Sequence, residues 1–323
     1  MDRAPLILVT EPIADVGLQL LADAGELCAP WLAGRSFNDE DLGEASALIV
    51  RLVPITASLI GKAKKLRVVG RHGAGLDTVD LQAATSRRIP VVYTPLVNAN
   101  AVAEHTIHLA LSLARHVLAG DRAVRESRFD LGDSLVGFEL RGKTLGVVGI
   151  GSIGLRVAEI AHKGFDMKVV TYDPFADALP PSHSFVRRAG SLRELLEGAD
   201  VVTMHSPLTT ETHHIINSES LKWMKRSALL INTSRGAVID THVLASVLNA
   251  GQLAGAALDV FENEPLPAHH PLQSAANVLF SPHIAGSTGE AREAMSELVA
   301  RQVLQVLRGE RPEFLANPQA FRD

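Results

Sequence analysis

The chain of 323 residues is predicted to be an α/β protein with two doubly wound parallel sheets. Short apolar runs alternate with amphipathic stretches along the chain, which is typical of parallel strands covered by helices on both faces of a sheet. The length, with 46% hydrophobic residues, suits about two domains with sizeable cores. A G-x-G-x-x-G pattern occurs only at 149–154, between a strand signal and a helix signal, so the two domains should differ.

The first domain is expected to alternate strands with helices. Its strands are the apolar runs at 6–9, 47–50, 66–69 and 91–93. Its helices cover 12–24, 56–63 and 81–87. Residues 101–118 then form a stretch that is apolar on nearly every side, and a helix of that kind is buried between domains or between subunits. We expect it at a two-fold contact between subunits, which predicts a homodimer.

The second domain begins with a strand at 145–148 that leads into Gly149, Gly151 and Gly154. The first glycine permits a tight turn, the second lets the backbone approach a pyrophosphate, and the third lets the following helix pack closely on the strand. The N-terminus of that helix offers free N–H groups and partial positive charge to phosphates. Asp173, at the end of the next strand, can accept hydrogen bonds from ribose hydroxyls. The stretch predicts an NAD site, with an ordinary βαβ turn and a capping aspartate as the alternative.

The rest of the second domain continues the alternation. Six strands are expected to end at Gly149, Asp173, Ser206, Thr233, Asp259 and His283. In an open parallel sheet, ligands bind outside the carboxyl ends of the strands, and polar or glycine residues gather at these ends. An amphipathic helix at 290–308 is expected to return to the first domain.

Composition argues against several classes of function. The net charge is −5 and the pI about 6.2, so no surface for nucleic acid is expected. No stretch of 18 apolar residues occurs, so no membrane span is predicted. The single cysteine, Cys28, suits a reducing compartment, and we expect the protein in the cytoplasm. The histidine pairs at 213–214 and 269–270 lack partners at ligand spacing, so no metal site is predicted.

Three segments follow the glycine turn in order: Asn-Thr-Ser-Arg-Gly-Ala-Val-Ile-Asp at 232–240, Leu-Asp-Val-Phe-Glu-Asn-Glu-Pro at 258–265 and Ser-Pro-His-Ile-Ala-Gly-Ser-Thr at 281–288. Together with 149–154 they resemble the signature of the D-isomer-specific 2-hydroxyacid dehydrogenases. The likeness is closest to the catalytic part of D-3-phosphoglycerate dehydrogenase and to hydroxypyruvate reductases. It implies an NAD-dependent oxidoreductase that interconverts a D-2-hydroxy acid and its 2-oxo acid by hydride transfer.

The resemblance also implies the domain organisation. A Rossmann NAD-binding domain at 99–287 would be inserted in a flavodoxin-like substrate-binding domain made of 1–98 and 288–323. The substrate cleft is expected between the two domains.

Arg235, Glu264 and His283 suit the reduction of a 2-oxo acid on chemical grounds alone. Arg235 can hold a carboxylate with two parallel hydrogen bonds, which lysine cannot. Histidine is the side chain that commonly exchanges a proton near neutral pH, so one at position 283 can give a proton in reduction and take one in oxidation. A carboxylate beside it, Glu264, favours the imidazolium form and fixes the ring. The resemblance assigns the same three catalytic roles to these positions.

The other candidate site residues fall into two groups. The cofactor contacts expected from the glycine pattern and from the resemblance are Gly149, Gly151, Ser152, Ile153, Gly154, Asp173, Ser206, Pro207, Thr233, Ser234, Asp259 and Gly286. The substrate contacts expected are Arg51, Arg71, Gly73, Ala74, Gly75 and Asn98. The resemblance implies that the backbone N–H groups of 73–75 bind the substrate carboxylate. Successive N–H groups of this kind form a concave site for an anion.

The positive groups Arg51 and Arg71, with His72, lie at or just beyond strand ends and suggest a substrate with a second polar or anionic end. Hydroxypyruvate, 3-phosphohydroxypyruvate or a sulfonated analogue would fit. Leu52 departs from the small hydroxyl residue of phosphoglycerate enzymes, which puts phosphate specificity in doubt. Salt bridges that hold the domain together are the alternative role for the two arginines.

Two other functions stay open at this point. Some relatives with this fold are nucleotide-sensing corepressors that bind partner peptides, and they keep the cofactor site. Formate and phosphite oxidation use the same architecture, but formate enzymes usually pair glutamine with the histidine, and Glu264 argues against that. The sequence leaves open the physiological acid and the direction of the reaction.

Overall fold

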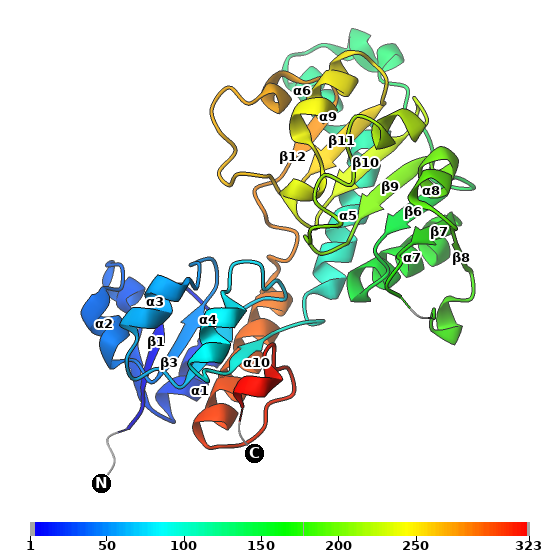
Figure 1. The fold of residues 1–323 in the computed structure, drawn as a ribbon. Helices are drawn as coiled ribbons and strands as arrows, with labels where there is room; N and C mark the ends of the chain where they lie inside the picture. Colours follow the sequence, from blue (N-terminus) through cyan, green and yellow to red (C-terminus); the bar gives the residue numbers. More distant parts are fainter. Residues whose placement is uncertain (1–3, 177, 322–323) are drawn as a thin grey trace. The chain divides into compact units, whose positions relative to one another are not determined.

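The computed structural model describes residues 4–176 and 178–321. The chain divides into two compact units (Figure 1). One unit contains the chain as far as Asn98 and again from Ser287, and the other is Ala99–Gly286. Each unit has one all-parallel sheet with helices on its faces, so the predicted fold class is confirmed.

The first unit has a five-stranded sheet in the order β2-β1-β3-β4-β5, which is the flavodoxin-like order. Its strands are β1 Leu6–Val9, β2 Glu26–Cys28, β3 Ala47–Val50, β4 Val68–Arg71 and β5 Val91–Tyr93. Its helices are α1 Asp15–Ala22, α2 Asp39–Glu44, α3 Ala57–Lys62, α4 Leu81–Ser86 and α10 Gly289–Leu307. Both β2 and α2 are absent from the sequence prediction, because each is short and carries charged residues.

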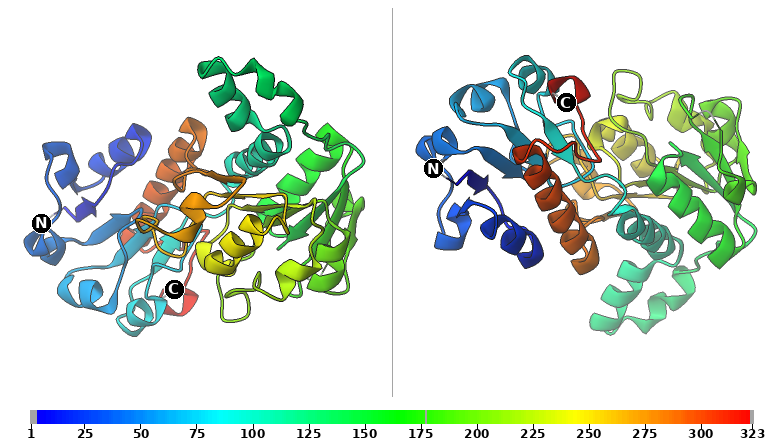
Figure 2. Two further views of the ribbon diagram at one scale, coloured as in Figure 1. Left: turned by 90° about the horizontal axis from the view of Figure 1, so that it is seen from above. Right: turned by 90° about the horizontal axis from the view of Figure 1, so that it is seen from below.

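Helix α10 belongs to the first unit, as predicted for residues 290–308. It packs on α1 and on the sheet (Figure 2). A Cβ atom on Gly70 of β4 would lie 2.7 Å from Val303 and 2.8 Å from Val299. Glycine at this position therefore lets the helix approach the middle of the sheet closely.

The second unit has seven strands in the order β12-β11-β10-β9-β6-β7-β8. The strands are β6 Thr144–Val148, β7 Lys168–Tyr172, β8 Val186–Arg188, β9 Val201–Met204, β10 Leu229–Asn232, β11 Gly255–Leu258 and β12 Val278–Phe280. Counted from β6, the order is that of the Rossmann fold with a seventh strand at one edge. The sequence predicts six strands; β8 was missed because only Val186 of its three residues is apolar and buried.

The expected single helix at 101–118 is two helices. Helix α5 is Ala99–Ala114, and α6 is Val117–Arg125. His116 between them has a left-handed backbone, with φ of 51°. The carbonyl of Ala114, the last residue of α5, accepts a hydrogen bond from Phe138 N at 3.0 Å. The apolar pattern continues across the break, so periodicity alone does not reveal it.

The other helices of the second unit are α7 Ser152–Phe165, α8 Leu192–Gly198 and α9 Thr241–Asn249. Helix α5 packs on α7 and on β10 and β11. Its buried side chains, including Ile107 and Leu109, belong to the core of its own unit. Among the described residues, none of the helices is both long and apolar enough to cross a membrane.

Candidate active site

The glycine turn joins β6 to α7 at the middle of the second sheet. Gly149 has φ of 90°, and a Cβ atom there would lie 2.6 Å from Ser206 N. A Cβ on Gly154 would lie 2.2 Å from the carbonyl oxygen of Gly149. By contrast, apart from its own chain neighbours, no heavy atom of the described residues lies within 4 Å of the place that a Cβ on Gly151 would take. The first and third glycines therefore let the backbone close up, while the second leaves the turn open to a ligand.

The donors and acceptors around this turn fit a dinucleotide. Helix α7 has no side-chain cap, so the N–H groups of its first turn can point at a pyrophosphate. Asp173 accepts hydrogen bonds from Ile150 N and from Phe175 N, each at 2.9 Å, which places its carboxylate beside the turn. Within the described chain, the buried Oγ of Ser206 has no hydrogen-bond partner. A buried hydroxyl in this state is suited to a bound ligand or water.

Glu264 and His283 meet at the end of β12. Glu264 Oε2 lies 2.7 Å from His283 Nδ1, and both side chains remain partly exposed, at 38% and 45%. Glu264 Oε1 accepts a hydrogen bond from Phe261 N at 3.0 Å. The carboxylate is thereby held by its own loop on one side and by the imidazole on the other.

The charge state of Glu264 follows from its neighbours. Partial burial acts to raise the pKa of Glu264, but the hydrogen bonds from His283 and Phe261 and the positive charge of Arg235 outweigh it, so the pKa lies below its ordinary value. Glu264 is therefore a carboxylate at neutral pH. Arg235, Glu264 and His283 form one electrostatic group in the second unit.

The loop of Arg235 is positioned by two residues to which the sequence prediction gave no role, Gly236 and Asn232. A Cβ atom on Gly236 would lie 1.8 Å from the carbonyl carbon of Phe261, so only glycine lets these two loops touch. Asn232, fully buried, accepts hydrogen bonds from Ser234 and donates one to the carbonyl of Arg235 at 2.8 Å. These contacts fix the loop that carries Arg235 against the loop that carries Glu264.

Asp259 is fully buried, and its carboxylate is bound by the loop that carries His283. Its Oδ1 accepts from Ser281 Oγ at 2.5 Å and from Ile284 N at 2.9 Å. Its Oδ2 accepts from Ala285 N at 2.9 Å. Although the resemblance implies a cofactor contact for Asp259, these bonds make it an anchor for the residues on both sides of His283.

The remaining predicted cofactor contacts also lie near strand ends. Ser152 and Ile153 lie in the first turn of α7. Pro207 directly follows Ser206 and is exposed. Thr233 Oγ1 lies 2.9 Å from Thr106 Oγ1 of α5, and both side chains are buried. Gly286 is the last residue of the second unit.

The candidate substrate residues of the first unit are partly engaged by the protein. Gly73 N donates a hydrogen bond to Thr94 Oγ1 at 2.8 Å. Arg71 donates to the carbonyl of Gly75 at 3.1 Å and to the carbonyl of His72 at 2.5 Å. The guanidinium of Arg71 therefore braces its own loop, and one of the three amides expected to bind an anion is already bonded.

Arg51 and Asn98 differ from Arg71. The backbone amides of 51–53 are all bound by Glu11 Oε2, at 2.7 to 3.0 Å, and this fixes the loop. The guanidinium of Arg51 makes one long hydrogen bond, 3.4 Å to the carbonyl of Pro12. Leu52 is 59% exposed. Oδ1 of Asn98 is buried and has no hydrogen-bond partner among the described residues.

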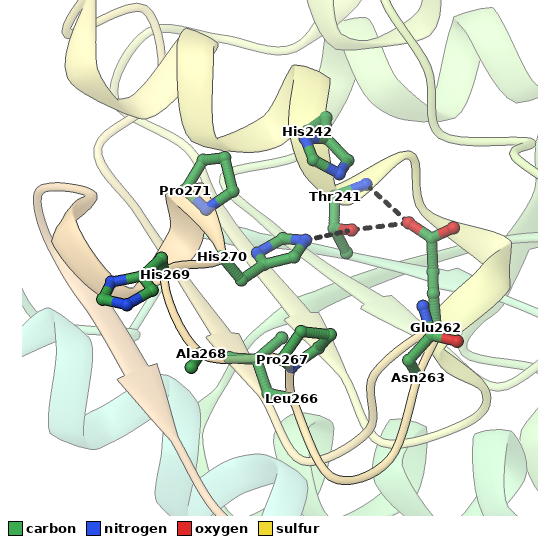
Figure 3. A pocket seen from close by; sticks show the side chains of 10 residues that line it. All are labelled: Thr241, His242, Glu262, Asn263, Leu266, Pro267, Ala268, His269, His270 and Pro271. Atoms are coloured by element: carbon green, nitrogen blue, oxygen red, sulfur yellow. Dashed lines mark hydrogen bonds between the residues drawn. The ribbon is translucent and has the colours of Figure 1, made fainter.

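A pocket of about 260 Å³ lies against the loop that carries Glu264 (Figure 3). Glu262 Oε1 accepts hydrogen bonds from Thr241 N at 3.1 Å and Thr241 Oγ1 at 2.5 Å. Glu262 Oε2 lies 3.1 Å from His214 Nε2. His270 Nε2 lies 3.4 Å from Thr241 Oγ1. No group of three metal-ligating side chains occurs in the part of the chain that the structure describes. Glu262 therefore ties the Glu264 loop to the N-terminus of α9.

The two-unit parallel fold and the open glycine turn define a dinucleotide-binding protein. The family described as D-isomer specific 2-hydroxyacid dehydrogenase, NAD binding domain, matches residues 107–285. A glyoxylate reductase of Thermofilum pendens is 39% identical over 98% of this chain and 96% of its own length. A D-3-phosphoglycerate dehydrogenase of Methanocaldococcus jannaschii is 38% identical over 96% of this chain and 59% of its own length.

Solved structures agree with these matches. The TT0316 protein of Thermus thermophilus superimposes with a TM-score of 0.87, at 37% identity, over 96% of this chain and 99% of that one. A D-lactate dehydrogenase of Aquifex aeolicus, solved with NAD and lactic acid, gives a TM-score of 0.83 at 29% identity. The match covers 94% of this chain and 96% of that one. The chain belongs to the D-isomer-specific 2-hydroxyacid dehydrogenase family, so the resemblance is confirmed. It is an NAD-dependent oxidoreductase.

Proposed function

We propose that this protein reduces a small 2-oxo acid, hydroxypyruvate or glyoxylate, to the 2-hydroxy acid with NADH. The observation that carries the proposal is the 2.7 Å contact between Glu264 Oε2 and His283 Nδ1. This contact fixes the imidazole and leaves Nε2 for proton transfer to the substrate. A neighbouring arginine adds the group that such an acid needs for its carboxylate.

Each of the three side chains has one role in the proposal. Arg235 binds the substrate carboxylate with paired hydrogen bonds. The hydride comes from NADH. His283 gives a proton to the carbonyl oxygen as negative charge develops there, and takes it back in the oxidative direction. Glu264 holds Nδ1–H and balances the positive charge of the protonated ring.

The cofactor contacts are proposed from the geometry of the glycine turn. The backbone of 149–154 and the first turn of α7 bind the pyrophosphate, and Asp173 binds the adenosine ribose. Ser206, whose buried hydroxyl lacks a partner in the described chain, faces the cofactor in this proposal. Pro207, Thr233, Ser234, Asp259 and Gly286 complete the set implied by the family.

The contacts of the first unit favour a small substrate over a phosphorylated one. Arg71 is occupied by two backbone carbonyls of its own loop. Leu52, exposed beside Arg51, offers no hydrogen bond to a phosphate. Arg51 is then the main positive group for the distal hydroxyl of hydroxypyruvate, with Ala74, Gly75 and Asn98 as further contacts. The relative named glyoxylate reductase supports a substrate of this size.

Three further proposals concern the roles of the two units, the assembly of the protein and its location. We assign substrate binding to the first unit and NAD binding to the second. We propose a homodimer in which the exposed apolar side chains of 117–136 meet a second copy: Val117, Leu118, Val124, Phe129 and Val136. Figure 2 shows this segment projecting from the second unit. The free Cys28 is consistent with the cytoplasm.

The absorbance of NADH, followed with a panel of 2-oxo acids, tests the proposed function. The panel contains glyoxylate, hydroxypyruvate, 3-phosphohydroxypyruvate and 2-oxobutyrate. We expect the highest kcat/KM for hydroxypyruvate or glyoxylate. A much higher value for 3-phosphohydroxypyruvate would contradict the substrate class, and no turnover of any 2-oxo acid would contradict the function. Sedimentation velocity at micromolar concentration tests the dimer.

A further inference from the structure

A chain of polar contacts runs from α5 to the loop that carries His283. His105 Nε2 lies 3.0 Å from Ser281 Oγ and 3.7 Å from Asp259 Oδ1. Ser281 Oγ lies 2.5 Å from the same carboxylate oxygen. His105 is 19% exposed and Asp259 is 1% exposed, so the contacts are largely shielded from water. Hydrogen bonds in such surroundings hold their geometry more firmly than exposed ones.

The direction of the hydrogen bonds follows from proton count. Asp259 as a carboxylate only accepts, so Ser281 gives its single hydroxyl proton to Oδ1. Ser281 Oγ must then accept from His105, whose Nε2 carries the proton. Burial lowers the pKa of His105 and the neighbouring His108 lowers it further, while Asp259 acts in the opposite direction. His105 is therefore a neutral donor at pH 7.

The far end of this chain of contacts holds His283 in an unusual backbone conformation. His283 has φ of 54°, in the left-handed region that side chains larger than glycine rarely adopt. Its own N–H donates to the carbonyl of Asp259 at 2.8 Å. The next two N–H groups, of Ile284 and Ala285, donate to the Asp259 carboxylate. Asp259 thus grips the loop around His283, and a conformation of this kind persists only when its surroundings enforce it.

We propose that His105 is a positioning residue for His283, acting through Ser281 and Asp259. The inference rests on the proposed function of His283 as the proton donor. Without the hydrogen bond from His105, Ser281 can rotate away from Asp259, and the loop can relax toward an ordinary backbone conformation. The imidazole of His283 then no longer meets Glu264 in the geometry that proton transfer requires.

The test compares three single variants. His105→Leu removes the donor, His105→Gln keeps an N–H group near the same place, and His108→Leu is the matched control. His108 is exposed on the same helix, with its ring centre 5.9 Å from that of His105. We expect His105→Leu to lower kcat about 10- to 100-fold, with the Kd for NADH changed by less than about twofold. His105→Gln should recover most of kcat, and His108→Leu should match the unaltered protein.

Two further measurements distinguish a positioning role of His105 from a folding defect and from a failure of the proposed function. Ser281→Ala removes the same link from its other end, so the double variant His105→Leu/Ser281→Ala should be no slower than the slower single variant. The ring nitrogen resonances of His283 should shift in His105→Leu and Ser281→Ala but not in His108→Leu, whether or not a substrate turns over. Additive losses, or His283 resonances that do not move, would overturn the inference. Lack of activity in the unaltered protein would overturn the proposed function alone.

Discussion

Two glycine-rich turns follow buried strands, one in each unit, and the protein uses them differently. In the first unit, Gly73 N is bonded to Thr94, and a Cβ on Gly73 would lie 2.7 Å from Arg71 Nη1. In the second unit, the place of a Cβ on Gly151 has no heavy atom of the described chain within 4 Å, apart from the two neighbouring residues. The first turn is closed by its own arginine, and the second is open in front of a helix N-terminus.

The difference shows that glycine content alone does not define an anion site. What matters is whether the backbone N–H groups and the space before them remain available after the chain has folded. Helix α7, with no side-chain cap, keeps its first N–H groups for a ligand. In the loop after β4, the N–H of Gly73 already donates a hydrogen bond to Thr94, so it is not available to a ligand. The second unit therefore keeps an open site for a dinucleotide, while the loop after β4 in the first unit keeps fewer free backbone donors.

The largest effect on cofactor binding is expected from closing the open turn. Gly151→Val places a branched side chain where the phosphates are proposed to bind. It should weaken NADH binding about 10²- to 10³-fold, the equivalent of one or two charge-assisted hydrogen bonds. Since the new Cβ meets no described residue other than its chain neighbours within 4 Å, the thermal unfolding temperature should hardly change. Binding is measured by NADH fluorescence. Unchanged affinity would refute the placement of the phosphates.

A smaller effect is expected from the two arginines of the first unit. Arg51→Ala should cost about 1.5–3 kcal/mol in kcat/KM for hydroxypyruvate and little for 2-oxobutyrate, because only the former has a distal hydroxyl. Arg71→Ala is the matched control, and it should lower both values alike because Arg71 braces its own loop. Equal losses on both substrates for Arg51→Ala would mean that this residue is structural too.

Stability of the first unit should depend on pH through His72. Burial lowers the pKa of His72 to about 4, and the charges of Arg51 and Arg71 act in the same direction. The unfolded chain therefore binds more protons between about pH 4 and about pH 6.5, and stability falls as the pH drops through that window. Between about pH 7 and about pH 5 the free energy of unfolding should fall by about 2 kcal/mol.

Tryptophan fluorescence can isolate this effect. Trp31 lies in the first unit, so a Trp223→Phe background reports on that unit during urea unfolding. His72→Gln should remove most of the pH dependence seen by Trp31. The signal of Trp223, in a Trp31→Phe background, serves as the control. A pH dependence that survives in His72→Gln would assign it to another group.

The smallest effect is expected at the adenosine ribose. Asp173→Ala should weaken NADH and reduce its advantage over NADPH by about 5- to 10-fold, roughly 1 kcal/mol. The expected cause is loss of hydrogen bonds to the ribose and of repulsion toward a 2′-phosphate. The ratio of kcat/KM for the two nucleotides measures it. A preference for NADPH in the unaltered protein would contradict this role of Asp173.

The parts of the site predictable from the sequence are those set by local pattern. The glycine spacing and the polar residues at strand ends follow from how parallel strands and helices alternate, and this is enough for the fold class and for the place of Asp173 and His283. The break at His116 is not predictable in this way, because the apolar pattern runs across it. Nor is β8, whose three residues carry two arginines.

The contacts that set the geometry of the site join distant residues. His105 and Ser281 are 176 positions apart, and Asp259 and Ala285 are 26 apart. Gly236 matters only because Phe261 passes next to it, and Thr94 only because it reaches Gly73. No local signal marks such residues, since their roles appear when the loops are brought together in three dimensions.

The role of His283 as proton donor is tested most directly by single-turnover hydride transfer in His283→Asn, followed by the absorbance of NADH with hydroxypyruvate and with glyoxylate. Asparagine keeps a polar side chain of similar reach but cannot give a proton at neutral pH. We expect a rate about 10²–10⁴-fold below that of the unaltered protein, with the Kd for NADH nearly unchanged. A full rate in His283→Asn would show that another group supplies the proton and would contradict the proposed role of His283.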